Sequence, residues 1–332
     1  MCKRIPAKLC AFFLALMLFA VPAFAENGAA EEKKYIKWID FNVTSQALKD
    51  ALEADVASYG SGHHCGWVNI LAYIASVNGG NFSSYRSQDV KKLVSRLEAG
   101  ETLDAIVSNK KLYNYYTEAY GAVLGGLVGE YTKVTVGEDG SEIYEKKYGL
   151  RAFSPIADGY YYNHYDDFGA SRSYGYRRSH LGHDLMGSVG TPIIAVESGY
   201  VECCGWNQYG GWRIGIRSFD SLRYYYYAHL RRGHPYCDIY EGKFVNAGDV
   251  IGYLGMTGYS TKEDTNNINV PHLHYGLQII FDPSQKDGTN QIWIDMYALT
   301  NFLSSSRSAT RRDSSSGESV SKVYYLYPET PD

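Results

Sequence analysis

The chain of 332 residues is poor in proline and cysteine, with 9 and 6 residues respectively. Beyond residue 25 it has no apolar run long enough to span a membrane, and its 34 glycines follow no Gly-X-Y period, which excludes a collagen-like chain. Hydrophobic residues make up 45% of the chain, which excludes a wholly disordered protein. The formal net charge is −4 and becomes more acidic without residues 1–25, so we expect no nucleic-acid partner.

Tyrosine is present in excess, with 32 residues against 12 phenylalanines and 5 tryptophans. A phenol suits partly wet surfaces and sheets better than deep cores, so we expect a β-rich protein with a groove. Two runs stand out, Tyr160–Tyr162 with Tyr165, and Tyr224–Tyr227. Alternation along a strand places half of the second run on one face, where it either packs across strands or lines a groove.

Residues 1–25 have the features of a secretory signal peptide. A positively charged start precedes the apolar stretch Leu9–Val21, and Ala23-Phe24-Ala25 has the small-x-small pattern of a cleavage site. The apolar stretch is shorter than the ~20 residues that a membrane-spanning helix needs. We therefore expect a secreted, extracellular protein whose mature chain begins at Glu26 and has no membrane span.

Four cysteines lie beyond the signal: Cys65, Cys203, Cys204 and Cys237. Export permits disulfides, and four thiols allow three full pairings, among which the sequence does not choose. Cys203 and Cys204 would point to opposite faces of a strand, so either one could pair with Cys237. Four thiols are too few for a disulfide framework in a chain of this length, and their spacing is not that of a zinc ribbon.

Hydrophobic spacing divides the mature chain into a helical part and a β-rich part. Apolar residues recur at helical spacing from Thr44 to about Glu130, and the polar passage 134–148 predicts a hairpin that turns at Asp139-Gly140. Short strand-like runs separated by Gly, Asn, Asp and Pro follow from Gly149 to Ile280, which is typical of an antiparallel sheet.

The C-terminal part predicts a short helix, Ile292 to Phe302, and then a flexible Ser/Arg-rich segment, 304–322. The predicted fold class is α+β multidomain, with a small helical domain followed by an antiparallel β-sheet domain. The predicted domains are a signal peptide (1–25), a helical N-terminal domain with its connecting hairpin (26–145), a β-sheet domain (146–303) and a flexible C-terminal tail (304–332).

Histidines form two patterns that suit metal binding. On a strand, His180 and Asp184 would share one face with the small Gly182 between them. His272 and His274 would likewise point to one side of a strand, so that one imidazole can bind a metal while the other serves as acid or base. Two histidines and one carboxylate form a ligand set of catalytic zinc, with the fourth position left to water.

The other histidines carry weaker signals. His234 and Asp238 repeat the H-x-x-x-D spacing, which we interpret as a coincidence in a loop. His229 follows the second tyrosine run and, on a continuing strand, would share a face with Tyr225 and Tyr227. Taken singly, each histidine also fits a hydrogen-bonded structural role.

Several motifs together resemble the signatures of the lysostaphin-type (LytM-like) zinc endopeptidases, in the family's order from about Asp166 to Leu277. They are His180-Leu-Gly-His-Asp184, Gly190-Thr-Pro-Ile-Ile-Ala195, Gly199-Tyr-Val201, Tyr227-Ala-His229-Leu230, Gly248-Asp-Val-Ile-Gly252, Gly255-Met-Thr-Gly258 and Pro271-His-Leu-His274.

The resemblance implies a compact antiparallel β domain with a groove. It implies a secreted zinc endopeptidase, associated with the cell wall, that hydrolyses peptide bonds in bacterial peptidoglycan (stem or cross-bridge) by a zinc-activated water. One Zn²⁺ would be bound by His180, Asp184 and His274. His229 and His272 would be unligated catalytic histidines that help to deprotonate the water and stabilise the oxyanion.

Two positions depart from the family pattern. Lys262–Val270 forms a longer loop before the final motif than typical members have, and we expect it to form one wall of the groove. Gly276 stands where many members carry an acidic residue. Neither departure removes a ligand.

Three other interpretations remain open. His63-His64-Cys65-Gly66-Trp67 lies at the apparent start of a helix, where a dipole would lower a thiol pKa as a cysteine peptidase requires, although a buried or merely exposed thiol explains it better. A LytM-like domain can also be a non-catalytic scaffold that binds cell wall or serves sporulation or division, but the complete set of five site residues favours a peptidase. The helical domain, which has no assigned role, could cover the groove in an autoinhibited state.

Overall fold

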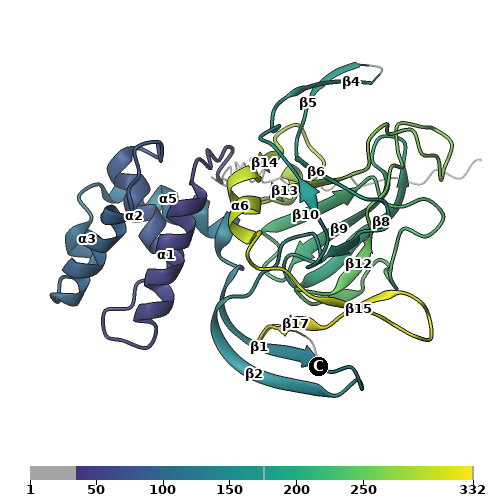
Figure 1. Ribbon diagram of the computed structural model, residues 1–332. Helices are drawn as coiled ribbons and strands as arrows, with labels where there is room; N and C mark the ends of the chain where they lie inside the picture. The colour runs from purple at the N-terminus through teal and green to yellow at the C-terminus, as the bar shows by residue number, and fades with distance from the viewer. Residues whose placement is uncertain (1–34, 175, 331–332) are drawn as a thin grey trace, which may run out of the picture. The chain divides into compact units, whose positions relative to one another are not determined.

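The structure is a computed structural model that describes residues 35–174 and 176–330 (Figure 1). The predicted signal peptide lies outside the described residues. Tyr35–Asp332 forms one compact unit. Within the described part of the chain, no helix has the length and apolar character needed to cross a membrane.

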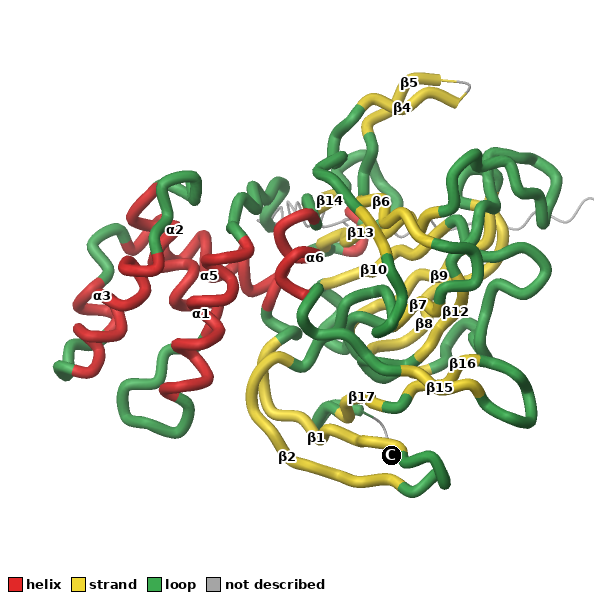
Figure 2. The backbone as a smooth tube through the Cα atoms, viewed as in Figure 1, coloured by secondary structure: helices red, strands yellow, loops and turns green. Residues whose placement is uncertain are grey.

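The helices predicted between residues 44 and 130 are confirmed, except that the last residues of this range belong to a strand. Thr44 caps the first helix by accepting a hydrogen bond from the amide of Ala47, and Gly79 ends the second in a left-handed conformation with φ 65°. Figure 2 shows the N-terminal helices grouped together. The helices are α1 (Ser45–Ser58), α2 (Trp67–Asn78), α3 (Ser87–Glu98), α4 (Leu103–Ile106), α5 (Lys110–Leu124), α6 (Tyr297–Leu303) and the short 3₁₀ helix η1 (Pro283–Gln285).

The predicted antiparallel β-sheet is also confirmed. Its central sheet has the strand order β11-β8-β9-β10-β13-β6-β3, with β14 paired to β13, and a second sheet has the order β17-β1-β2. The strands are β1 (Val128–Val136), β2 (Glu142–Leu150), β3 (Tyr162–Asn163), β4 (Ser171–Tyr174), β5 (Tyr176–Ser179), β6 (His183–Gly187), β7 (Pro192–Ile194), β8 (Gly199–Asn207), β9 (Gly211–Ser218), β10 (Arg223–Ala228), β11 (Phe244–Val245), β12 (Val250–Tyr253), β13 (His272–Ile279), β14 (Ile292–Ile294), β15 (Thr310–Arg312), β16 (Ser319–Ser321) and β17 (Val323–Leu326).

The helices and the central sheet share one hydrophobic core, so the expected boundary at 145/146 does not separate compact units. The ring of Trp67 on α2 packs 5.5 Å from that of Phe302 on α6. The buried guanidinium of Arg223 on β10 donates to the carbonyl of Ala122 on α5 at 2.9 Å. Ile292–Ile294 extends the sheet as β14, so the helix predicted from Ile292 begins only at Tyr297.

The C-terminal tail is ordered as far as residue 330, which corrects the expectation of a flexible segment from 304 to 332. β15 pairs with β16, and β17 adds an outer strand to β1. Serine-rich composition predicted a flexible segment, but the serine hydroxyls donate to backbone carbonyls. Ser321 Oγ lies 2.7 Å from the carbonyl oxygen of Gly248, and Ser308 Oγ lies 2.7 Å from the carbonyl oxygen of Val323. The tail therefore supplies hydrogen-bond partners to neighbouring loops.

Candidate metal centre and active site

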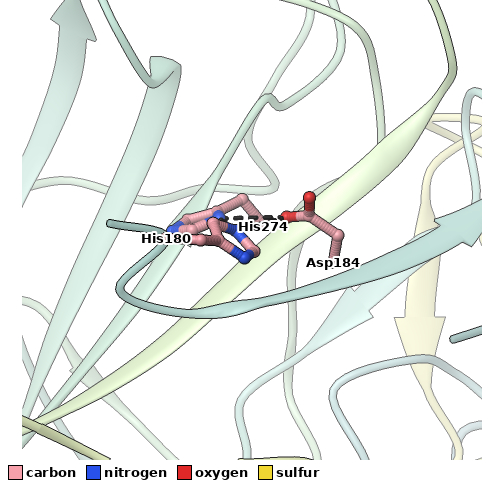
Figure 3. Close-up of side chains that lie close together, drawn as sticks. All are labelled: His180, Asp184 and His274. Carbon is pink, nitrogen blue, oxygen red and sulfur yellow. Dashed lines mark hydrogen bonds and ion pairs between the residues drawn. The ribbon is translucent and has the colours of Figure 1, made fainter. Parts of the chain in front are cut away.

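The three predicted metal ligands come together at the junction of β5, β6 and β13 (Figure 3). Asp184 on β6 pairs directly with His274 on β13, which places both side chains on one face of the sheet. The spacing predicts that His180 and Asp184 share a strand. This prediction is wrong, because His180 lies between β5 and β6. A Cβ at Gly182 would be 2.5 Å from His274 Cε1, so the backbone of Gly182 lies against the His274 ring.

Three atoms form a nearly equilateral triangle. His180 Nε2 lies 3.1 Å from Asp184 Oδ1 and 2.9 Å from His274 Nδ1, and the last two atoms are 3.0 Å apart. Ligands at 2.0–2.1 Å from a tetrahedral zinc are about 3.3 Å apart, so the triangle fits zinc with a small expansion. Among the described residues, these three form the one group of His, Cys, Asp or Glu side chains with metal-binding geometry.

Asp167, which belongs to none of the sequence motifs, lies next to the ligand His180 and outside the triangle of ligand atoms. Its buried carboxylate accepts hydrogen bonds from His183 Nδ1 at 3.1 Å and Arg172 Nη2 at 2.9 Å. His180 Nδ1 lies 3.2 Å from this carboxylate and donates to the Asp167 backbone carbonyl at 3.0 Å. The bond to Nδ1 leaves the Nε2 lone pair of His180 directed at the other ligands. Arg172 also donates to the second oxygen of Asp184 at 3.2 Å, so both carboxylates are oriented by one guanidinium.

The electrostatics of the site favour a cation. Burial opposes ionisation of His180, but hydrogen bonds with Asp167 and Asp184 raise its pKa to about 9. Burial raises the pKa of Asp184, but hydrogen bonds with His180 and His274 outweigh this effect and hold the pKa well below its usual range. A metal ion among these atoms would take the place of the proton that the carboxylates otherwise attract.

His229 and His272 lie beside the ligands, as the resemblance implies. The ring of His229 is 4.8 Å from that of His272 and 5.9 Å from that of His274. His229 Nδ1 donates to the carbonyl of Thr257 at 2.8 Å, and His272 Nδ1 donates to that of Val270 at 2.8 Å, so each ring keeps Nε2 free. Burial, with the neighbouring His272 and His274, lowers the pKa of His229 to about 3, so this imidazole is neutral at pH 7.

His229 has a left-handed backbone, with φ 61°, which is uncommon for a residue other than glycine. This turn breaks the strand alternation after Ala228. The tyrosines on the histidine's side are therefore Tyr224 and Tyr226, and the expectation that His229 shares a face with Tyr225 and Tyr227 is wrong.

A cavity of about 330 Å³ opens over the five site residues. Tyr224 and Tyr226 contribute to its wall, whereas the buried Tyr225 and Tyr227 face the opposite side of the sheet. Its lining residues are Arg172, Arg178, Ser179, His180, Leu181, Asp184, Tyr209, Gly210, Arg213, Tyr224, Tyr226, His229, Tyr259, His272, His274, Gln278, Lys286, Asp287, Gln291 and Trp293.

Several expected walls of the groove are absent from this lining. The Lys262–Val270 loop contributes no lining residue and instead supports Tyr259, whose carbonyl accepts from Asn267 Nδ2 at 2.7 Å. Neither the helices between residues 35 and 145 nor the run Tyr160–Tyr165 contributes a lining residue to this cavity. At Gly276 a Cβ would lie 2.9 Å from the Trp293 ring, which explains the glycine there.

The cysteine alternatives do not fit the structure. Cys65 is 5% exposed, and burial raises the pKa of its thiol to about 12, so the nucleophilic thiolate of a cysteine peptidase is disfavoured. The neighbouring His64 bonds to Asp55 at 2.7 Å. All four described cysteines are free thiols, so none of the possible disulfides forms.

The second H-x-x-x-D match, His234 and Asp238, forms no metal site. His234 Nε2 lies 2.8 Å from Glu318 Oε1, in agreement with a chance match in a loop.

Comparisons with known proteins agree with this geometry. The chain is 35% identical over 166 residues to the L-Ala–D-Glu endopeptidase of Bacillus subtilis, covering 50% of this chain and 47% of the relative. It is 37% identical over 97 residues to lysostaphin of Staphylococcus simulans, covering 29% of this chain and 17% of the relative. The chain thus spans less than half the length of these curated relatives.

The fold likeness extends beyond the metal centre. The crystal structure of lytM from Ruminococcus gnavus ATCC 29149 matches with a TM-score of 0.53 at 22% identity, covering 82% of this chain and 92% of that chain. Residues 178–288, which contain all five site residues, match the family model described as Peptidase family M23. Residues 178–288 are therefore similar to peptidase family M23, and the fold is similar to that of the lytM structure.

Proposed function

We propose that this chain is a secreted, zinc-dependent endopeptidase that acts at the cell wall and hydrolyses peptide bonds of bacterial peptidoglycan. The observation that carries the proposal is the convergence of His180, Asp184 and His274 with two further imidazoles in one cavity. The names of relatives support the substrate class, since they include a glycyl-glycine endopeptidase from Staphylococcus capitis and a peptidoglycan DD-endopeptidase from Vibrio cholerae.

His180, Asp184 and His274 would hold the metal, with Asp167 and Arg172 fixing their orientation. Bound zinc would supply a Lewis acid that polarises the scissile carbonyl and makes a water molecule more acidic.

The two unligated histidines would move the protons. Neutral His229 would accept a proton at Nε2 as the water oxygen bonds to the carbonyl carbon, while its Nδ1 stays bonded to Thr257. The C–N bond then breaks, and the leaving nitrogen takes up the proton that His229 holds at Nε2. His272, whose Nε2 lies 3.7 Å from Asp184 Oδ1, would in its protonated form donate to the oxyanion.

The test is digestion of peptidoglycans of known cross-link type by the mature chain, with and without a chelator, and identification of the fragments by mass spectrometry. We expect His180→Ala to lose both zinc and activity, and His229→Ala to keep most of its zinc but lose activity. His234→Ala is the matched control, because this exposed histidine lies outside the cavity. A fully active His229→Ala would overturn the assignment.

The same experiment separates the peptidase from a non-catalytic scaffold. A purified protein that holds no zinc and cuts no peptidoglycan would favour the scaffold. Secretion is tested by measuring the mass of the protein recovered from the culture medium, which should correspond to a chain that begins at Glu26.

A further inference from the structure

The cavity carries positive charge that hydrolysis does not use. Arg172 is paired with Asp167 and Asp184, but three further cations line the cavity: Arg178, Arg213 and Lys286. Asp287 is the other carboxylate of the lining besides Asp184. A positive cavity in a chain of net charge −4 favours an anionic ligand.

Arg213 has the most free hydrogen-bonding capacity of these cations. Its Nη1 donates to Cys203 Sγ at 3.0 Å, and its buried Nε has no hydrogen-bond partner among the described residues. No carboxylate of the described chain lies within ion-pair distance of it. Arg178, in contrast, donates to the hydroxyl of Tyr259 at 2.6 Å, and Lys286 lies 3.7 Å from Glu202. A guanidinium in such a place has donors to offer a planar carboxylate.

The sheet register places Arg213 at a useful distance from the metal ligands. Ala228 on β10 pairs with His274 on one side, and Tyr227 pairs with Ile214 on the other. The next position along the second ladder sets Arg213 opposite Ala228. Arg213 and His274 are therefore two strand spacings apart, which is about 10 Å between backbones.

That distance is the length of about three extended residues. The guanidinium of Arg213 is bonded to Cys203 on β8, on the other side of β9 from the metal ligands, so a ligand has to span at least this distance. A peptide whose carbonyl lies at the metal ligands would therefore bring a side-chain or terminal carboxylate about three residues from the cut bond to the guanidinium. Gly210, which lines the cavity, lies against the methyl group of Ala228.

We propose that Arg213 is a specificity-determining residue that binds a substrate carboxylate close to the scissile bond, so that the enzyme prefers acidic stem peptides to neutral cross-bridges. This inference rests on the proposed function. A hydrogen bond to a charged group changes an affinity by about 10- to 100-fold, and we expect a preference of that size.

The test compares kcat/KM on synthetic stem peptides that contain an L-Ala–D-Glu bond. One peptide has both carboxylates free, one has the D-Glu carboxylate amidated, and one has the C-terminal carboxylate amidated. N-acetylpentaglycine amide, which has no carboxylate, is the neutral comparison. The two amidated peptides identify which carboxylate is bound, and the ratio of rates within one preparation is independent of the fraction of folded enzyme.

We expect the wild type to prefer one carboxylate over its amide by at least tenfold, and Arg213→Gln to reduce that ratio to about one while its zinc content is unchanged. Arg213→Lys should keep part of the preference. Arg232→Gln removes one exposed positive charge outside the cavity and should keep all of it.

Equal wild-type kcat/KM values on all peptides would overturn the inference, and so would an Arg213→Gln variant whose kcat/KM falls by the same factor on every peptide. Either result would leave the proposed peptidase function unaffected. Cleavage of no peptide and no peptidoglycan would overturn both.

Discussion

Asp167 should control zinc affinity without binding the metal. His183 and Arg172 donate to its buried carboxylate. His180 Nδ1 lies 3.2 Å from the same carboxylate and donates to the Asp167 backbone carbonyl. Asp167→Asn keeps the shape of the side chain but turns one acceptor oxygen into an amide donor. At least one of the two donors then loses its partner, and His180 loses the negative charge beside its ring, although its bond to the Asp167 backbone carbonyl remains.

The magnitude follows from these contacts. A hydrogen bond to a charged group contributes about 1.5–3 kcal/mol, which corresponds to about a 10- to 150-fold change in an equilibrium constant. Loss of a carboxylate behind a metal-binding histidine has effects of about 10- to 100-fold on metal affinity. We therefore predict that the zinc Kd of Asp167→Asn rises about 10- to 100-fold, while saturating zinc restores most of the activity because all three ligands remain.

The assay is competition for zinc against a chromophoric chelator, with the mature chain. Asp166→Asn is the matched control, since the adjacent carboxylate is exposed. Circular dichroism confirms that both variants are folded. A zinc Kd for Asp167→Asn within twofold of wild type would refute the reasoning.

Three further variants test the packing and the electrostatics. Gly182→Ala should displace His274 and lower the bound zinc measured after gel filtration, whereas Gly62→Ala, in open space, should not. Arg223→Met leaves the 3% exposed Glu197 without its cation and should lower the free energy of unfolding in urea by about 3–5 kcal/mol. Burial raises the pKa of Asp249 to about 6, so its contribution to stability is present below about pH 4 and lost as the pH rises through 6. Asp249→Asn should therefore match wild type at pH 4 and be more stable at pH 8, and equal stability at pH 8 would contradict this.

The ligand set could be predicted because each ligand lies within a short motif. His272 and His274 alternate with a buried leucine along β13, as a period of two requires. The position of His180 outside a strand could not be predicted, because the turn before β6 is set by contact with residues far away in the chain. Asp167 lies 13 residues from His180 with no local pattern, so only the folded structure identifies it.

The errors elsewhere have similar causes. The prediction that Tyr225 and Tyr227 lie on the same face as His229 is wrong because it assumes a continuous strand, whereas φ at His229 is positive and ends the alternation. The prediction of a flexible tail is wrong because it treats every serine and arginine side chain as exposed to solvent. In the structure Arg307 donates instead to the carbonyls of Ala157 and Tyr160, which no composition rule anticipates.

The excess of tyrosine and the frequent glycine have a common explanation at the groove. Tyr225 and Tyr227 belong to the core, where their hydroxyls bond to Glu197 and to the amide of Val196. Tyr224 and Tyr226 face the cavity, and a Cβ at Gly215 or Gly210 respectively would collide with their hydroxyls. A larger residue at either glycine would therefore require the neighbouring phenol to move. Glycine at these two positions therefore leaves room for the phenols of Tyr224 and Tyr226 in the wall of the cavity, to which Arg213 contributes a positive charge.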